Sequence, residues 1–364
     1  MHAKLFVGAI ACLALAACGG DNTTAPREPN QFVAQFDGLW AKYDAIYPYF
    51  NYKKINWDSL RTVYRPRAAN ATSQAELVDV LADLLANLRD GHASLIDPNG
   101  NSRGTYQPTL FYNWNQPVWL SSALRYNLHF KNNSFAYATI ASVPYIFIAS
   151  WVDANISAAA VDSVIDLFPN APAYIIDLRR NSGGDTVPAF HMAERFYDTP
   201  RAGEYILHRI GPKHSDLSPA SPVTLTPRGA KPLIKPVLVL TGRASASAAE
   251  DFVSAMQVLP NVTLAGDTTA GVAGYPIIET LGNGWAYTLP TAMVLTASLH
   301  VIEWNGIAPS VYIRTTSDDF AAGIDPVFEY AVQWAMGHSA QTIAGVPHRQ
   351  TSLKKWNNRQ PRDQ

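Results

Sequence analysis

Short apolar strands alternate with helical segments from residue 135 onward, and this alternation dictates the class of fold. Strands are expected at 135–140, 145–151, 173–179 and 236–242, helices at 158–168 and 189–197, and a further helix near residue 247. Parallel strands joined by helices need right-handed crossovers, which cover both faces of the sheet. The sequence therefore predicts an α/β fold with a largely parallel sheet flanked by helices.

The N-terminal part of the chain has a helical pattern instead. From Phe32 to Tyr47, apolar residues recur at the three- and four-residue spacing of an amphipathic helix. Ser73 and Glu76 form a capping-box pattern at the start of a later, leucine-rich helix. The expected domains are a helical subdomain at 32–92 and an α/β core at 93–336, which closes with a helix opened by Asp325 and Pro326.

The first 17 residues have the pattern of a secretory signal peptide. Cys18 directly follows a Leu-Ala-Ala run, as the lipidated cysteine does in a bacterial lipobox; the alternative is an ordinary cleaved signal in which Cys18 is incidental. Lipidation would attach the protein to a membrane of the bacterial cell envelope through a tether at 18–31. Because Cys12, the other cysteine, lies in the removed segment, no disulfide is expected.

Composition narrows the choice of partners. The chain is 48% hydrophobic and 16% charged, which is typical of a folded globular protein. Its net charge of −1 gives no overall electrostatic field that would attract nucleic acid. The basic tail at 337–364 is expected to be solvated and disordered rather than to contact a membrane or nucleic acid. Nothing in the sequence implies a metal, a nucleotide or another cofactor.

The stretch GRASASAAEDF, residues 242–252, lies where an expected strand ends and a helix begins, at the carboxyl edge of the sheet. Ser247 and Glu250 together fit a capping box, which needs no chemistry. A serine at this position also has free N–H groups and the positive end of the helix dipole beside it, which suit an oxyanion. The two interpretations are compatible.

Five motifs occur in the order LRDGHASL, IIDLRRNSGGD, TGRASASAAEDF, GDTTAG and EWNGIAPS. In this order they resemble the tail-specific (C-terminal processing) serine protease family, which includes the tricorn core protease and interphotoreceptor retinoid-binding protein. The resemblance extends over about residues 33–336 and implies a ClpP/crotonase-like core with serine peptidase activity. It also implies that Ser247 is the nucleophile and Ser245 a structural neighbour.

The resemblance implies an oxyanion hole as well. The N–H of Ala248 would form it together with the N–H of Gly183 or Gly184 in the glycine turn. Glycines suit this position, since the backbone must approach the substrate carbonyl closely and can need a positive φ.

The general base distinguishes two branches of the family. Processing proteases use a lysine where this chain has Val272, and no lysine occurs between Lys235 and Lys354. The tricorn-like branch uses a histidine and a glutamate, which correspond to His92 and Glu303. His300 is the fallback base.

Two departures from the family pattern limit what carries over. The late motif continues as Pro309-Ser310 instead of proline–aspartate, and only 42 residues separate His92 from the strand at Phe135. That interval is too short for a PDZ module, since domains need about 50 residues or more. We expect an exported peptidase that acts on a peptide or protein substrate. The alternative is a non-catalytic lipoprotein that binds an apolar ligand on the same fold.

Overall fold

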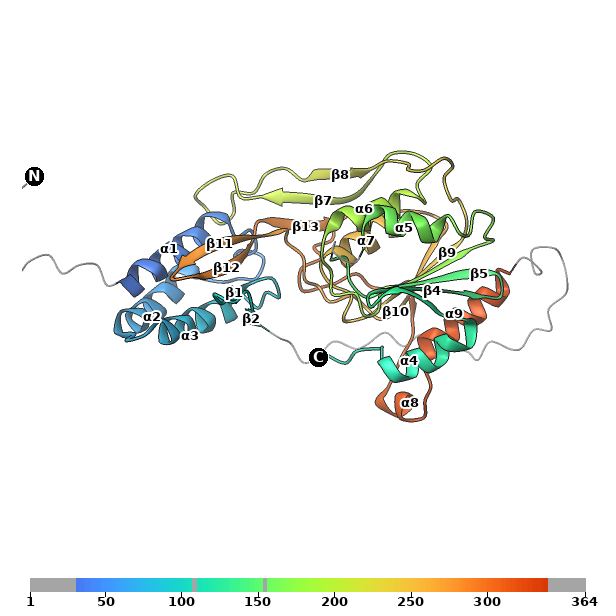
Figure 1. Cartoon of the computed structure of the whole chain (residues 1–364). Coiled ribbons are helices and arrows are strands. Elements are labelled where there is room, and N and C mark those ends of the chain that lie inside the picture. Colours follow the sequence, from blue (N-terminus) through green and yellow to red (C-terminus); the bar gives the residue numbers. More distant parts are fainter. Residues whose placement is uncertain (1–30, 107–109, 153–155, 340–364) are drawn as a thin grey trace, which may run out of the picture.

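The computed structural model describes residues 31–106, 110–152 and 156–339, and a seven-stranded sheet forms its centre (Figure 1). In spatial order its strands are β14 (Val311–Tyr312), β10 (Val262–Gly266), β9 (Val237–Thr241), β6 (Tyr174–Asp177), β5 (Val143–Ile148), β4 (Phe135–Ile140) and β3 (His129–Asn132). The strands from β14 to β5 run parallel, whereas β4 and β3 are antiparallel additions at one edge. The predicted α/β fold with a largely parallel sheet is confirmed.

Helices cover both faces of this sheet. One face packs against α5 (Ala158–Ile165), α6 (Thr186–Glu194) and α7 (Ala248–Gln257), and the other against α4 (Gln116–Ala123) and α9 (Pro326–Gly337). The central strands are buried along their whole length, because neither of their faces meets water. The carboxyl ends of β6 and β9 therefore point to one edge, where the loops that follow them lie together.

The helical subdomain contains α1 (Gln31–Ile46), α2 (Trp57–Asn70) and α3 (Gln74–Ala86). Ser73 caps α3 by accepting from the N–H of Glu76 at 3.2 Å, while Glu76 reaches back to the N–H of Thr72. These helices share one hydrophobic core with the four-stranded antiparallel sheet of β11 (Pro276–Gly282), β12 (Trp285–Pro290), β1 (Ser94–Ile96) and β2 (Ser102–Gly104). Late segments of the chain thus fold onto the N-terminal helices.

A third, three-stranded sheet lies between these two parts (Figure 1). Its strands are β13 (Ala292–Thr296), β7 (Arg201–His208) and β8 (Ser221–Leu225), and β7 also packs against α7. The short helices η1 (Leu124–Tyr126) and α8 (Ser317–Ala321) complete the described elements. No helix in the described ranges is long and apolar enough to cross a membrane.

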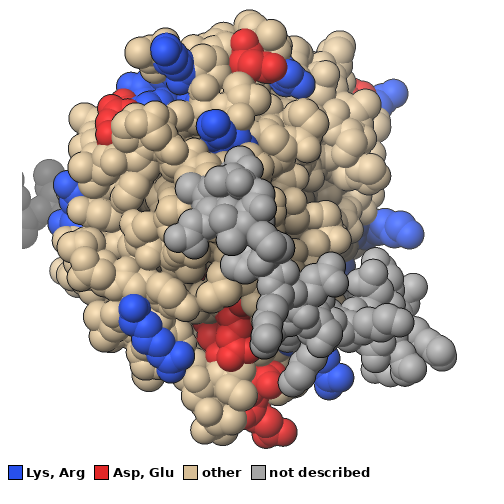
Figure 2. Space-filling model, turned by 90° about the vertical axis from the view of Figure 1, so that its right-hand side faces the viewer, with Lys and Arg blue, Asp and Glu red and all other residues tan. Residues whose placement is uncertain are grey.

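Figure 2 views the end of the molecule opposite the helical subdomain. Lys and Arg side chains are spread singly over its visible surface, and a small group of acidic side chains lies near the lower edge. The visible part of this face therefore has no contiguous basic area of the kind that follows a phosphate backbone.

Candidate active site

Ser247 occupies the tight turn between β9 and α7. Its backbone has φ 55° and ψ −127°, a combination that costs a residue with a Cβ about 1–3 kcal/mol. The turn is held by the N–H of Ser247, which donates to the carbonyl of Val272 at 3.0 Å and to the Glu250 carboxylate at 3.2 Å. This geometry directs the Ser247 hydroxyl away from its own helix and into the open cleft.

Glu250, the glutamate of the SAAE motif, fixes this turn to the facing loop. Its buried carboxylate accepts from the N–H groups of Gly271 and Val272, both at 2.8 Å, and from the Thr269 hydroxyl at 2.6 Å. Burial raises the pKa of Glu250 to about 7, although these donors oppose the shift. Glu250 thus forms the predicted capping box with Ser247, and the Ser247 hydroxyl also contacts another residue.

That residue is His92. Its Nε2 lies 3.0 Å from Ser247 Oγ, across 155 positions of sequence. The histidine follows α3 in a loop that is fixed at two points: the N–H of His92 donates to Asp90 at 2.9 Å, and its carbonyl accepts from the Thr288 hydroxyl. Burial lowers the pKa of His92, with Asp90 opposing the shift and Lys53 adding to it, so the imidazole is neutral and able to accept a proton at neutral pH.

Val272 occupies the position of the lysine base of the processing proteases. Its side chain packs against Gly91, the residue before His92, and this contact brings the histidine close to the serine. A Cβ on Gly91 would lie 2.9 Å from the Val272 methyl groups, so the two loops touch at this point. Only a glycine before His92 permits this approach. The alternative base, His300, is exposed and lies 3.0 Å from Ser298, with no contact to Ser247 among the described residues.

Glu303 is buried but does not touch His92 in the part of the chain that the structure describes. One of its oxygens accepts from Lys53 Nζ at 2.5 Å, and the other from the N–H of Ala273 at 3.0 Å. Burial and the nearby charge of Asp90 raise the pKa of Glu303, and Lys53 opposes the rise. The glutamate therefore acts on the loop beside the nucleophile and reaches His92 only through other residues.

Lys53 is the functional residue that sequence reasoning missed. Its ammonium group is buried and also donates to Asp90 at 3.2 Å and to the carbonyls of Leu88 and Arg89 at 3.1 and 3.3 Å. The rings of Tyr47, Tyr49 and Trp304 surround it at 5.1–5.7 Å from their centroids. The only signal in the sequence is the aromatic run YPYFNYKK, which could surround a cation but does not distinguish Lys53 from the exposed Lys54.

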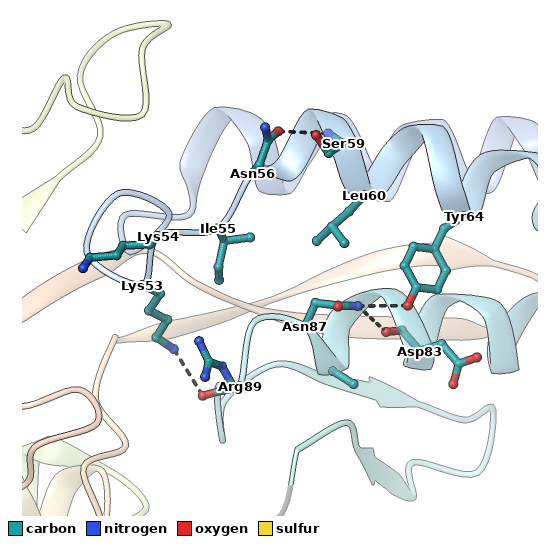
Figure 3. A pocket seen from close by; sticks show the side chains of 11 residues that line it. Lys53, Lys54, Ile55, Asn56, Ser59, Leu60, Tyr64, Asp83, Asn87 and Arg89 are labelled. Carbon is teal, nitrogen blue, oxygen red and sulfur yellow. Dashed lines mark hydrogen bonds between the residues drawn. The ribbon is translucent and has the colours of Figure 1, made fainter.

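Figure 3 shows where Lys53 lies in a shallow pocket of about 700 Å³ between α2 and α3. Its side chain extends toward the backbone of Arg89, whereas the neighbouring Lys54 points away. Asn87 spans the other side of the pocket by donating to the Tyr64 hydroxyl at 3.1 Å and to the Asp83 carbonyl at 2.8 Å. The helical subdomain therefore places the Lys53 ammonium group in contact with the loop that carries His92.

The glycine turn lies on the other side of Ser247. A Cβ on Gly183 would come within 2.6 Å of Ser247 Cβ and 3.2 Å of the Ala248 nitrogen, so no larger residue fits here. The N–H of Gly183 already donates to Asn181 Oδ1 at 2.9 Å. The N–H groups of Ala248 and Gly184 have no acceptor among the described residues. Of the two glycines, Gly184 is thus the one whose N–H is free to donate.

Two other predicted residues have clear positions. Ser245 is buried and donates to the Leu178 carbonyl at 2.8 Å while it accepts from the N–H of Gly242 at 3.1 Å, so it braces the turn. Ser310, which replaces the family's aspartate, donates to the Leu264 carbonyl at 2.9 Å and so ties the late motif to β10. Cys18 lies outside the described residues. No group of metal-ligating side chains is found in the described ranges.

Ser247 lines two cavities whose charged side chains differ. The larger, of about 830 Å³, contains His92, three arginines and no carboxylate among its lining residues. The smaller, of about 480 Å³, contains the carboxyl groups of Asp185 and Asp251 and no lysine, arginine or histidine. Ser247 therefore lines one cavity with arginine side chains, of which Arg179 is paired with Asp177 and Asp325, and one cavity with carboxyl groups.

A serine–histidine contact at the edge of an α/β sheet is an arrangement found among serine hydrolases, a class that includes serine peptidases. Residues 142–313 match the model of peptidase family S41, and residues 29–86 match that of the tricorn protease C1 domain. The chain thus carries the domains of S41 peptidases, and the resemblance in its sequence motifs is confirmed.

Named relatives agree with these domains. The chain is 32% identical over 143 residues to carboxyl-terminal-processing peptidase 3 of Arabidopsis thaliana. This match covers 39% of this chain and 26% of that protein. It is 30% identical over 141 residues to a carboxy-terminal processing protease of Bacillus subtilis, covering 39% and 28% of the two chains. The chain therefore spans only about a quarter of the length of these relatives.

Solved structures match over a much larger share of the chain. A candidate peptidase from Parabacteroides merdae is 28% identical with a TM-score of 0.72, and the match covers 86% of this chain and 98% of that one. The photosystem II D1 C-terminal processing protease has a TM-score of 0.50 at 15% identity, covering 82% of this chain and 96% of that one, which supports the fold alone.

Proposed function

We propose that this chain hydrolyses peptide bonds with Ser247 as nucleophile and His92 as general base. The observation that carries the proposal is the 3.0 Å contact between Ser247 Oγ and His92 Nε2, which lies within the range for proton transfer. His92 takes the hydroxyl proton as Oγ attacks the carbonyl carbon. The protonated imidazole then gives that proton to the leaving amine nitrogen.

The N–H groups of Ala248 and Gly184 are the proposed donors to the oxyanion, in keeping with their lack of internal acceptors. Ala248 follows Ser247 in the chain, Gly184 lines the smaller cavity together with Ser247, and the N-terminus of α7 adds its dipole at the same point. The acyl-enzyme that forms is then hydrolysed by water, with His92 again removing the proton. Glu303 orients the catalytic residues indirectly. It accepts from Lys53 and from the N–H of Ala273, and Ala273 lies on the loop beside the Ser247 turn.

The second candidate is a binding protein that uses the larger cavity for an apolar ligand. Tyr106, Leu110, Tyr112 and Trp114 line that cavity and favour such a ligand. A binding role, however, gives no reason for a neutral histidine to face a serine in a strained turn. The directed Ser247–His92 contact therefore favours the enzyme.

A fluorophosphonate that reacts with activated serines, followed by peptide mapping, tests the proposal. We expect modification at Ser247 and loss of both labelling and peptide hydrolysis in Ser247→Ala. Ser182→Ala is the matched control, because Ser182 is an exposed serine that lines the same cavity. Unchanged hydrolysis in Ser247→Ala would remove the catalytic assignment and favour the binding protein.

We further propose export and lipid attachment at Cys18, on the basis of the signal and lipobox patterns in the sequence. Mass spectrometry of the mature N-terminus should find a lipidated Cys18, and Cys18→Ser should move the protein from the membrane fraction to the soluble one. An unmodified terminus at another residue would contradict the anchor.

A further inference from the structure

Of the three pairs of buried acids in the described ranges, two follow one rule. Asp177 and Asp325 share Arg179 at 2.8 and 2.7 Å, and Asp90 and Glu303 share Lys53. In each case a buried cation lies between two buried carboxylates, as expected when charges are removed from water.

The exception is the pair formed by Glu204 on β7 and Asp251 on α7. Both side chains are buried, with 0% and 5% of their surface exposed, and their carboxyl groups lie within hydrogen-bonding reach of each other. Tyr275 donates to one Glu204 oxygen at 2.5 Å, and no cation contacts either carboxyl group in the described ranges. This pair lacks the cation that the other two pairs have.

Asp251 lines the smaller cavity beside Ser247, together with Gly184, Tyr275 and Thr291. The cavity contains no basic side chain, so nothing within it can neutralise the pair. A group that enters from outside can do so, because the cavity is open to the nucleophile.

The position of His92 assigns this cavity to one half of the substrate. The imidazole must protonate the leaving amine, so the leaving half of the peptide lies in the larger cavity, which contains His92. The acyl half, including the residue whose carbonyl is attacked, then extends to the opposite side of Ser247. That side is the smaller, acidic cavity.

We propose that this cavity is the subsite for the residue on the acyl side of the scissile bond, and that Asp251 and Glu204 select a lysine or arginine side chain there. The inference rests on the proposed peptidase function and adds the substrate class. The incoming ammonium or guanidinium group supplies the cation that the pair lacks. Burial raises the pKa values of both Glu204 and Asp251, so the empty pair retains a proton, and this proton leaves as the cation enters.

The test compares two phosphonate diphenyl esters that differ only in carrying a lysine or a norleucine side chain. Ser247 Oγ bonds to phosphorus and phenol leaves, so the rate of Ser247 modification reports occupancy of the acyl subsite without turnover. We expect the lysine probe to react roughly 10- to 100-fold faster with the wild type, as a charge-assisted hydrogen bond predicts. Peptides with lysine or norleucine on the acyl side should give the same preference in kcat/KM.

Asp251→Asn should reduce the lysine-to-norleucine ratio to about 1 to 3, because an amide neither carries a charge nor shares a proton. Glu204→Gln serves the same purpose if the first variant does not fold. Asp79→Asn is the matched control, since this aspartate is 64% exposed and lies on α3, and it should leave the ratio unchanged.

Equal rates for the two probes in the wild type would overturn the subsite. A ratio that persists in a folded Asp251→Asn or Glu204→Gln variant would do the same. Failure of the general fluorophosphonate to modify Ser247 would instead reject the peptidase function, so the two failures are distinguishable.

Discussion

Lys53 and Glu303 form a 2.5 Å ion pair with both side chains buried, although 250 positions separate them in the sequence. Lys53 comes from the helical subdomain and Glu303 from the loop that follows β13. Because Lys53 also binds Asp90, whose other oxygen fixes the N–H of His92, the pair joins the two loops that flank the catalytic centre. The helical subdomain is therefore a structural part of the active site.

Lys53→Met should strongly reduce stability and shift the pH profile. Removing the cation leaves Asp90 and Glu303 buried without a counter-charge, which costs about 3–5 kcal/mol of unfolding free energy. Lys53 also lowers the pKa of His92, so its loss should raise that pKa and move the acidic limb of kcat/KM to higher pH.

Denaturant unfolding and pH–rate profiles measure the two effects. Lys53→Arg keeps the charge and should move the acidic limb less than Lys53→Met does. Lys54→Met removes the same charge from the exposed neighbour and should change neither property. A Lys53→Met enzyme with wild-type stability and an unmoved limb would show that the ion pair positions nothing.

The activity of the wild type should fall as the solution becomes acidic, with the limb set by His92. Burial lowers the pKa of His92 below its ordinary value of 6.5, so the neutral, proton-accepting form persists at pH 7 and is lost only below about pH 6.5. His92→Ala should lower kcat by roughly 10²- to 10⁴-fold at pH 7. A limb above pH 8, or a His92→Ala variant with near-normal kcat, would require another base.

Local patterns in the sequence predicted much of the fold. Ser73 and Asp325 could be recognised as helix caps because each accepts from an N–H only three residues further along the chain. The central strands could be recognised as apolar runs because both of their faces are buried. The contact of Ser247 with His92 came from the family resemblance, since no local rule joins residues 155 positions apart.

The remaining features depend on tertiary contacts that a linear pattern does not contain. Lys53 has the appearance of a surface lysine until the folded chain surrounds it with two carboxylates and three aromatic rings. Glu303 was expected to orient the network around the base, and the sequence did not show that Lys53 occupies one side of its carboxylate. The packing of β11 and β12 onto the N-terminal helices likewise brings together segments that are about 200 residues apart in the sequence.

Glu250→Gln should impair catalysis without removing any reacting group. Each carboxylate oxygen accepts two hydrogen bonds, and an amide NH₂ would face either the N–H groups of Ser247 and Val272 or the Gly271 N–H and the Thr269 hydroxyl. We expect a loss of about 1–3 kcal/mol in stability and a lower kcat, because the loop no longer fixes the Ser247 turn. Glu279→Gln, at a partly exposed ion pair with Lys42, is the control. Wild-type kcat in Glu250→Gln would show that the turn is rigid without this carboxylate.

The strained turn at Ser247 can be tested through stability alone. Alanine at this position keeps the Cβ and hence the strain of a φ of 55°, whereas glycine adopts that φ without it. Relief of about 1–3 kcal/mol of strain exceeds the roughly 0.5–1 kcal/mol of extra chain entropy that glycine loses on folding. Ser247→Gly should therefore be more stable than Ser247→Ala in denaturant unfolding, although both lack activity. The control is Ala249→Gly in the first turn of α7, where the backbone is ordinary and glycine should destabilise by about 1 kcal/mol. If glycine destabilises position 247 as much as position 249, the turn stores no strain, and the outward direction of the nucleophile must come from the bonds to Val272 and Glu250 alone.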